Sequence, residues 1–134
     1  VVAAIEGAEV VVVCPSNPFV SVAPIRAVAG IAAALDAAPA PTVAVSPIVG
    51  GAAIKGPAAR MFASLGEEAS ALGVARRYAG WVDGLVIDEV DAALAPAVEA
   101  LGMAVLVTRT VMGGPEDRAR LAAETVAFGR GLAR

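Results

Sequence analysis

Four short apolar runs constrain the fold of this chain more than any other feature. They cover residues 10–14, 42–46, 85–88 and 103–107, and most of their residues are valine, isoleucine or leucine. Their apolar residues follow one another directly, without the polar alternation of a strand that faces water on one side. We therefore expect four strands of a parallel sheet that is covered on both faces.

The segments between these runs have the apolar spacing of amphipathic helices. Pro24 and Gly30 are expected to divide the first helical segment, and Pro96 to shorten or kink the fourth. The last segment opens with a proline and two acidic residues, which favour a helix N-terminus. The expected helices cover residues 21–38, 57–65, 70–79, 91–101 and the chain from 114 onward.

Strands and helices thus alternate along residues 1–134, which we treat as a single α/β segment. Such an order implies a parallel sheet with right-handed crossovers. We expect a Rossmann-like three-layer α/β sandwich, and the abrupt start favours the C-terminal half of a larger doubly wound domain. Ligands of such folds bind outside the carboxyl ends of the strands, so the loops after residues 14, 46, 88 and 107 are the places to search.

Composition excludes several classes of protein. Although 58% of the residues are hydrophobic, no apolar run reaches the ~18–20 residues of a membrane-spanning helix. The chain has no histidine, which excludes a Ser-His-Asp triad and imidazole metal ligands within it. A net charge of −3 and few aromatic residues argue against nucleic-acid binding. The lone Cys14 fits a reducing cytoplasm.

Charge is distributed unevenly between the four loops. Residues 10–66 contain one acidic residue, Asp36, against Arg26, Lys55 and Arg60. That segment therefore has a net charge of +2, and the rest of the chain −5. An anionic ligand would be favoured at the first two loops and repelled at the other two.

The first two loops contain the candidate binding residues. The first is a turn that two prolines flank, and its polar side chains either shape that turn or bind a phosphate or sugar. In the second, two adjacent glycines permit an anion nest, and the only lysine precedes a proline-started helix; a flexible turn with a solvated lysine is the alternative. The candidates are Ser16, Asn17, Ser46, Gly50, Gly51 and Lys55.

The third and fourth loops are acidic. Asp88 or Asp91 could bind Mg²⁺, since hard cations prefer oxygen ligands, or could cap the helix that follows. For Glu116 and Asp117 we expect helix capping.

At the first two loops the sequence closely resembles the 2-phospho-L-lactate transferase family. The segments that carry the resemblance are CPSNPFVSV at 14–22, SPIVGG at 46–51 and KGPA at 55–58. Further similarity lies in DGLVID at 83–88 and in Met112 followed by Asp117-Arg118 and Leu121-Ala122. The resemblance covers almost the whole chain, as the C-terminal part of a family member.

The resemblance implies an enzyme of coenzyme F-420 biosynthesis. Such a transferase moves a 2-phospholactyl group, or a phosphoenolpyruvyl group in actinobacteria, from a guanosine diphosphate (GDP) conjugate to a hydroxyl of the deazaflavin FO, and releases GMP. It also implies Mg²⁺ as cofactor and a homodimer. The acidic metal-binding region of the family has no counterpart here, so the metal ligands and the catalytic base stay unassigned, and activity of this segment alone is in doubt.

Within that reaction, strand-end position and charge suggest roles for the candidates. Lys55 and the amides of Gly50 and Gly51 would bind diphosphate oxygens. Ser16, Asn17 and Ser46 would orient the donor or the acceptor hydroxyl. Two alternatives stay open: a non-catalytic nucleotide- or phosphosugar-binding regulator of the same fold, and a structural dimerisation segment.

Overall fold

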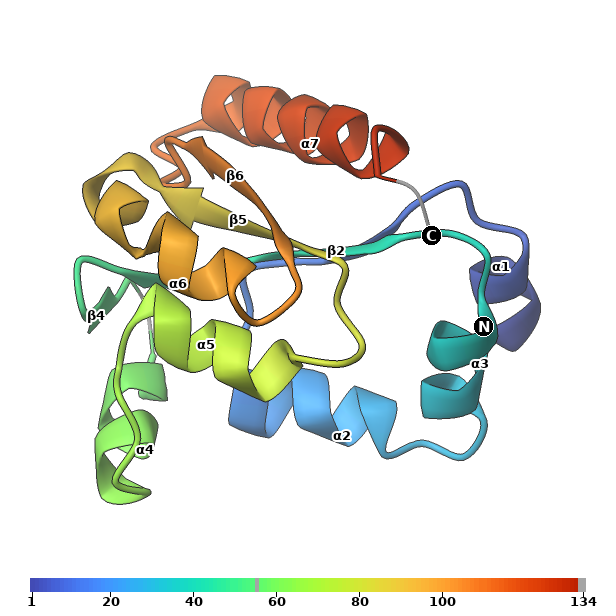
Figure 1. Ribbon diagram of the computed structural model, residues 1–134, viewed down its shortest axis with the longest axis horizontal. Helices are drawn as coiled ribbons and strands as arrows, with labels where there is room; N and C mark the ends of the chain where they lie inside the picture. The colour runs from blue at the N-terminus through green and yellow to red at the C-terminus, as the bar shows by residue number, and fades with distance from the viewer. Residues whose placement is uncertain (55, 133–134) are drawn as a thin grey trace.

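The computed structural model describes residues 1–54 and 56–132 as an α/β sandwich of three layers (Figure 1). The central layer is a parallel sheet in the spatial order β1-β2-β5-β6. It confirms the four predicted strands, and each strand begins and ends within one residue of its apolar run. The strands are β1 (Val11–Val13), β2 (Thr42–Val45), β5 (Gly84–Asp88) and β6 (Ala104–Thr108).

The two central strands explain why the apolar runs are continuous. Every residue of β2 and β5 is buried. Along β2, Val43 and Val45 pack into the core on one face of the sheet, whereas Ala44 packs into the core on the other. A strand that contributes to two cores has no position for a polar side chain facing water.

Helices cover the two faces of the sheet unequally. The strands follow one another across the sheet in chain order, as in one half of a doubly wound sheet, so crossovers of one hand place the connecting helices on the same face. Of the described helices, α7 (Pro115–Arg130) alone lies on the opposite face, and it follows the last strand (Figure 1). The helices on the face opposite α7 include α2 (Ala23–Arg26), α3 (Ile31–Ala37), α5 (Ala71–Tyr78) and α6 (Ala95–Glu99).

The predicted helices are present, with local differences at the prolines. The segment predicted at 21–38 begins earlier, with a π-helical turn, η1 (Pro18–Val22), and its break falls at Gly30. Pro24 does not divide the segment, because it lies in the first turn of α2, where no amide hydrogen is needed. The segment predicted at 91–101 is shortened as expected, into a 3-10 helix, η2 (Glu89–Leu94), followed by α6. The remaining helices are α1 (Val2–Glu6) and α4 (Ala58–Ser64).

A small hairpin in the second loop was not predicted. Strands β3 (Ile48–Val49) and β4 (Ala52–Ala53) pair antiparallel across Gly50 and Gly51. The two glycines have φ angles of 58° and 77°. Positive φ at both positions is the requirement of a type I′ turn, which two glycines meet without strain.

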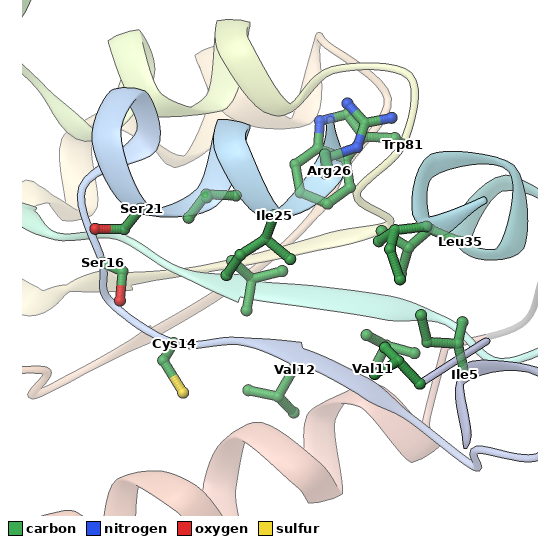
Figure 2. Close-up of a pocket in the computed structure, with 14 residues that line it drawn as sticks. Ile5, Val11, Val12, Cys14, Ser16, Ser21, Ile25, Arg26, Leu35 and Trp81 are labelled. Carbon is green, nitrogen blue, oxygen red and sulfur yellow. The ribbon is translucent and has the colours of Figure 1, made fainter. Parts of the chain in front are cut away.

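The outer edge of β1 has no neighbouring strand among the described residues. Beside it runs a largely apolar groove of about 320 Å³ (Figure 2). Val12 and Ile25 line this groove and are 37% and 61% exposed. The sheet therefore ends here in an uncovered apolar edge.

Among the described residues, no single helix has the length and hydropathy to cross a membrane. One strongly bent pair, Pro18–Arg26 with Ile31–Ala37, meets the criteria of length and composition, with 83° between its two parts.

Candidate functional site

A pocket of about 190 Å³ lies at the carboxyl ends of the strands. The loops after β1, β2 and β6 contribute to it, together with the starts of α4 and α7. This is the edge of the sheet at which the fold predicts a ligand. Its lining residues are Pro15, Asn17, Ser46, Pro47, Ile54, Ala58, Thr110, Met112 and Arg118.

Asn17 combines a structural role with a group that faces the pocket. Its side-chain oxygen accepts hydrogen bonds from the amides of Phe19 at 2.9 Å and Val20 at 3.3 Å. This cap begins η1 and confirms the interpretation of the first loop as a turn. Within residues 1–54 and 56–132, the Nδ2 group donates to the sulfur of Met61 alone, at 3.5 Å. Because sulfur is a weak acceptor, this amide remains the better donor for a ligand.

Ser46 lines the same pocket but is fixed from within. Its Oγ donates to the carbonyl of Ile48 at 2.9 Å and accepts from the amide of Ile48 at 3.2 Å. The side chain is buried, with 1% exposure. Ser46 thus holds the start of the β3–β4 hairpin, and it keeps one acceptor lone pair for a ligand.

Ser16 does not join Asn17 and Ser46. Its side chain lines the groove beside β1, with Cys14 and Ser21 nearby (Figure 2). The structure therefore divides the polar pair of the first loop between two hollows. Adjacent residues of a turn commonly project in different directions, which the sequence alone did not show.

The Gly50–Gly51 turn is held by an acidic residue of the third loop. The amide of Gly50 donates to both carboxylate oxygens of Asp91, at 3.0 Å and 3.2 Å, and Asp91 is buried. An oxyanion could bind the Gly50 amide only by replacing this carboxylate. Binding of a diphosphate oxygen by Gly50 therefore stays a prediction, and it requires the contact with Asp91 to open. Lys55 lies outside the described residues.

Asp88 performs the capping that the sequence predicted for this loop. It accepts hydrogen bonds from the amide of Val90 at 3.2 Å, and from the amide and hydroxyl of Thr110 at 2.7 Å and 3.0 Å. Burial raises the pKa of Asp88, but the hydrogen bonds from Thr110 and Val90 outweigh burial and leave the pKa below its usual value. The ionised carboxylate links the end of β5 to the loop after β6.

The described carboxylates do not form a site that fits Mg²⁺. No group of three metal-ligating side chains gathers anywhere in residues 1–54 and 56–132. The two candidates are Asp88 and Asp91. Their carboxylate oxygens already accept hydrogen bonds from backbone amides and from the hydroxyl of Thr110. Their interpretation as helix caps and turn supports is the one that the geometry favours.

Two polar residues of the pocket, Thr110 and Arg118, were not among the predicted site residues. Thr110 is buried beneath the pocket, and Arg118 projects from the first turn of α7. Arg118 belongs to a segment that carries the family resemblance, in which it follows Met112 by six residues. That resemblance was the signal by which Arg118 could have been predicted as a site residue.

The fold and this pocket place the chain among Rossmann-like α/β proteins that bind ligands at the carboxyl edge of a parallel sheet. Comparison with known sequences is more specific. The model of the family "2-phospho-L-lactate transferase CofD" matches residues 1–109. The chain belongs to this family, as the resemblance had predicted.

Its relatives include 2-phospho-L-lactate transferases and phosphoenolpyruvate transferases. The chain is 41% identical over 119 residues to a 2-phospho-L-lactate transferase of Methanothermobacter thermautotrophicus, covering 89% of this chain and 38% of the relative. It is also 41% identical over 129 residues to a phosphoenolpyruvate transferase of Streptomyces avermitilis, covering 96% of this chain and 40% of the relative. The chain thus spans about two fifths of the length of these relatives.

Proposed function

We propose that this chain is a segment of a transferase in coenzyme F-420 biosynthesis, and that it binds substrate at the carboxyl ends of its strands. The enzyme would move a 2-phospholactyl or phosphoenolpyruvyl group from a GDP conjugate to a hydroxyl of FO. One observation carries the proposal. Asn17 and Ser46, which come from two segments with family resemblance, line one pocket at the carboxyl ends of the strands.

The proposed reaction is a displacement at phosphorus. The hydroxyl oxygen of FO attacks the phosphorus of the transferred group, and the bond from that phosphorus to the bridging oxygen breaks. GMP leaves with the bridging oxygen, and the hydroxyl proton passes to a base. Catalysis of such a step depends mainly on positioning and on neutralising negative charge.

The pocket residues suit positioning. The Nδ2 group of Asn17 would donate to the donor substrate, and the free lone pair of Ser46 would accept from a hydroxyl. We keep Gly51 and Lys55 as proposed ligands of the diphosphate, with Gly50 joining them if the Asp91 contact opens. Ser16 would contribute from the neighbouring groove.

Three further features follow from the family resemblance and from composition. We propose Mg²⁺ as a requirement of the whole transferase, with its ligands outside the described residues of this chain. We also propose a homodimer, and the cytoplasm as its location.

A chimera tests the activity. This chain would replace the matched segment of the Methanothermobacter thermautotrophicus relative, and GMP release would be measured with the GDP conjugate and FO. We expect GMP release from the chimera and from its Arg130→Ala control, since Arg130 pairs with Glu9 far from the pocket. A chimera that melts cooperatively but releases no GMP contradicts the proposal. Binding of GDP without binding of FO would favour the regulator instead.

A structural role is the second candidate, and the uncovered edge of β1 favours it. Val12 and Ile25 expose apolar surface beside an edge with no strand partner among the described residues. A strand from the part of the transferase that this chain does not span would fit there. Val12→Lys should then prevent co-purification of this chain with the complementary part of the relative, and Leu65→Lys, at an exposed helix end, should not. Equal recovery of both variants would exclude this role.

A further inference from the structure

Arg118 contributes the one charged side chain among the described residues that line the pocket. It lies in the first turn of α7 and is exposed. Among the described residues, its guanidinium has no hydrogen bond or ion pair. Its charge is therefore available to a ligand.

A neighbouring arginine shows what a structural role looks like on this helix. Arg120 pairs with Glu124 at 3.0 Å and lies 4.0 Å from Asp117. It also donates to the carbonyl of Arg109 at 2.7 Å and to the hydroxyl of Thr108 at 3.3 Å. Arg120 thereby fastens α7 to the end of β6, a task in which Arg118 has no part.

Helix stability does not explain Arg118 either. A cation in the first turn of a helix opposes the positive end of the helix dipole. Glu116 and Asp117 in the same turn have the favourable sign, and Asp117 also accepts from the amide of Gly113 at 2.8 Å. Arg118 therefore has an unfavourable position without a compensating partner among the residues that the structure describes.

The pocket has the size and walls for a small acid. Its volume of about 190 Å³ is below the roughly 300–1,000 Å³ of pockets that hold drug-sized ligands. Ile54, Ala58 and Met112 give it apolar walls, and Asn17 adds an amide donor. The buried carboxylate of Asp88 is already hydrogen-bonded to Thr110, which lines the pocket.

We propose that Arg118 positions the donor substrate by binding the carboxylate of the transferred three-carbon acid. This inference rests on the proposed function, in which either donor carries such a carboxylate. The planar guanidinium matches a carboxylate with two parallel hydrogen bonds. The apolar walls would then contact the methyl or methylene carbon, and the diphosphate would lie toward the Gly50–Gly51 turn.

Paired ligands test the carboxylate contact directly. NMR titrations of the chain would compare 2-phospho-L-lactate with isopropyl phosphate, which has a methyl group in place of the carboxylate, and GDP would be titrated separately. We expect the wild-type chain to prefer 2-phospho-L-lactate by roughly tenfold or more. Arg118→Gln should remove this preference, Arg118→Lys should keep part of it, and Arg130→Ala should keep all of it.

The outcomes separate this inference from the proposed function. Equal affinities of the wild-type chain for the two small ligands, or an unchanged preference in Arg118→Gln, would overturn the role of Arg118. GDP binding would leave the transferase proposal intact in either case. If the wild-type chain bound neither small ligand, the role of Arg118 would be excluded, whereas the transferase proposal is decided by GMP release from the chimera.

Discussion

The buried carboxylate of Asp91 holds the amide of Gly50, which lies 41 residues earlier in the chain, at 3.0 Å and 3.2 Å. This contact joins the loop after β2 to the loop after β5. It therefore positions the hairpin turn that we propose to lie near the diphosphate.

We expect Asp91→Ala to destabilise the chain. The substitution would leave the Gly50 amide without its acceptor, at a cost of about 1–3 kcal/mol in the free energy of unfolding. Asp91→Asn keeps one acceptor oxygen and should lose less. Urea denaturation measures both changes, and an Asp91→Ala variant as stable as the wild type would contradict a structural role for the contact.

A pair of substitutions at Asn17 should separate folding from binding. Asn17→Ala removes the cap on η1, which should cost about 0.5–2 kcal/mol of stability. Asn17→Asp retains a capping oxygen but replaces the Nδ2 donor by a carboxylate oxygen. We expect Asn17→Asp to fold with near wild-type stability and to bind 2-phospho-L-lactate far more weakly, by NMR titration. Undiminished binding by Asn17→Asp would remove Asn17 from the site.

The strands could be predicted because their physics is local. A strand buried on both faces must be apolar along its whole length, and this signal needs no knowledge of its neighbours. The β3–β4 hairpin also had a local signal, since Gly50-Gly51 between two apolar pairs fits a two-residue type I′ turn. From the sequence we interpreted these glycines as an anion nest or a flexible turn and predicted no strand pair around them.

The arrangement of the site could not be predicted in the same way. The Asp91–Gly50 contact depends on β2 and β5 being neighbours in the sheet. Ser16 lines the groove beside β1, whereas the next residue, Asn17, lines the pocket. Arg118 reaches the pocket only because α7 crosses back over the face opposite the other helices (Figure 1). Each of these facts comes from tertiary packing rather than from a residue pattern.

Gly84 permits the close approach of α7 to the sheet. A Cβ atom at this position would lie 2.7 Å from the ring of Phe128 and 2.8 Å from Leu132. We expect Gly84→Ala to cost about 1–3 kcal/mol by overpacking. Gly131→Ala is the matched control, because its Cβ would meet neighbours at ordinary distances of 3.4 Å or more. Thermal melting compares the two, and equal melting temperatures would show that α7 can shift away without cost.

Asp88 should make the stability of the chain depend on acidity. Its pKa in the folded state is lowered by hydrogen bonds from Thr110 and Val90 that outweigh the effect of burial, whereas an unfolded aspartate titrates near ~3.9. Its ionised form therefore stabilises the fold above that value, and this contribution is lost as the pH falls toward the folded pKa. Asp88→Asn cannot titrate, so it should be less stable at neutral pH and lose less stability between about pH 5 and pH 3. Urea midpoints measured across this range should converge for the two proteins, and parallel curves would contradict the linkage.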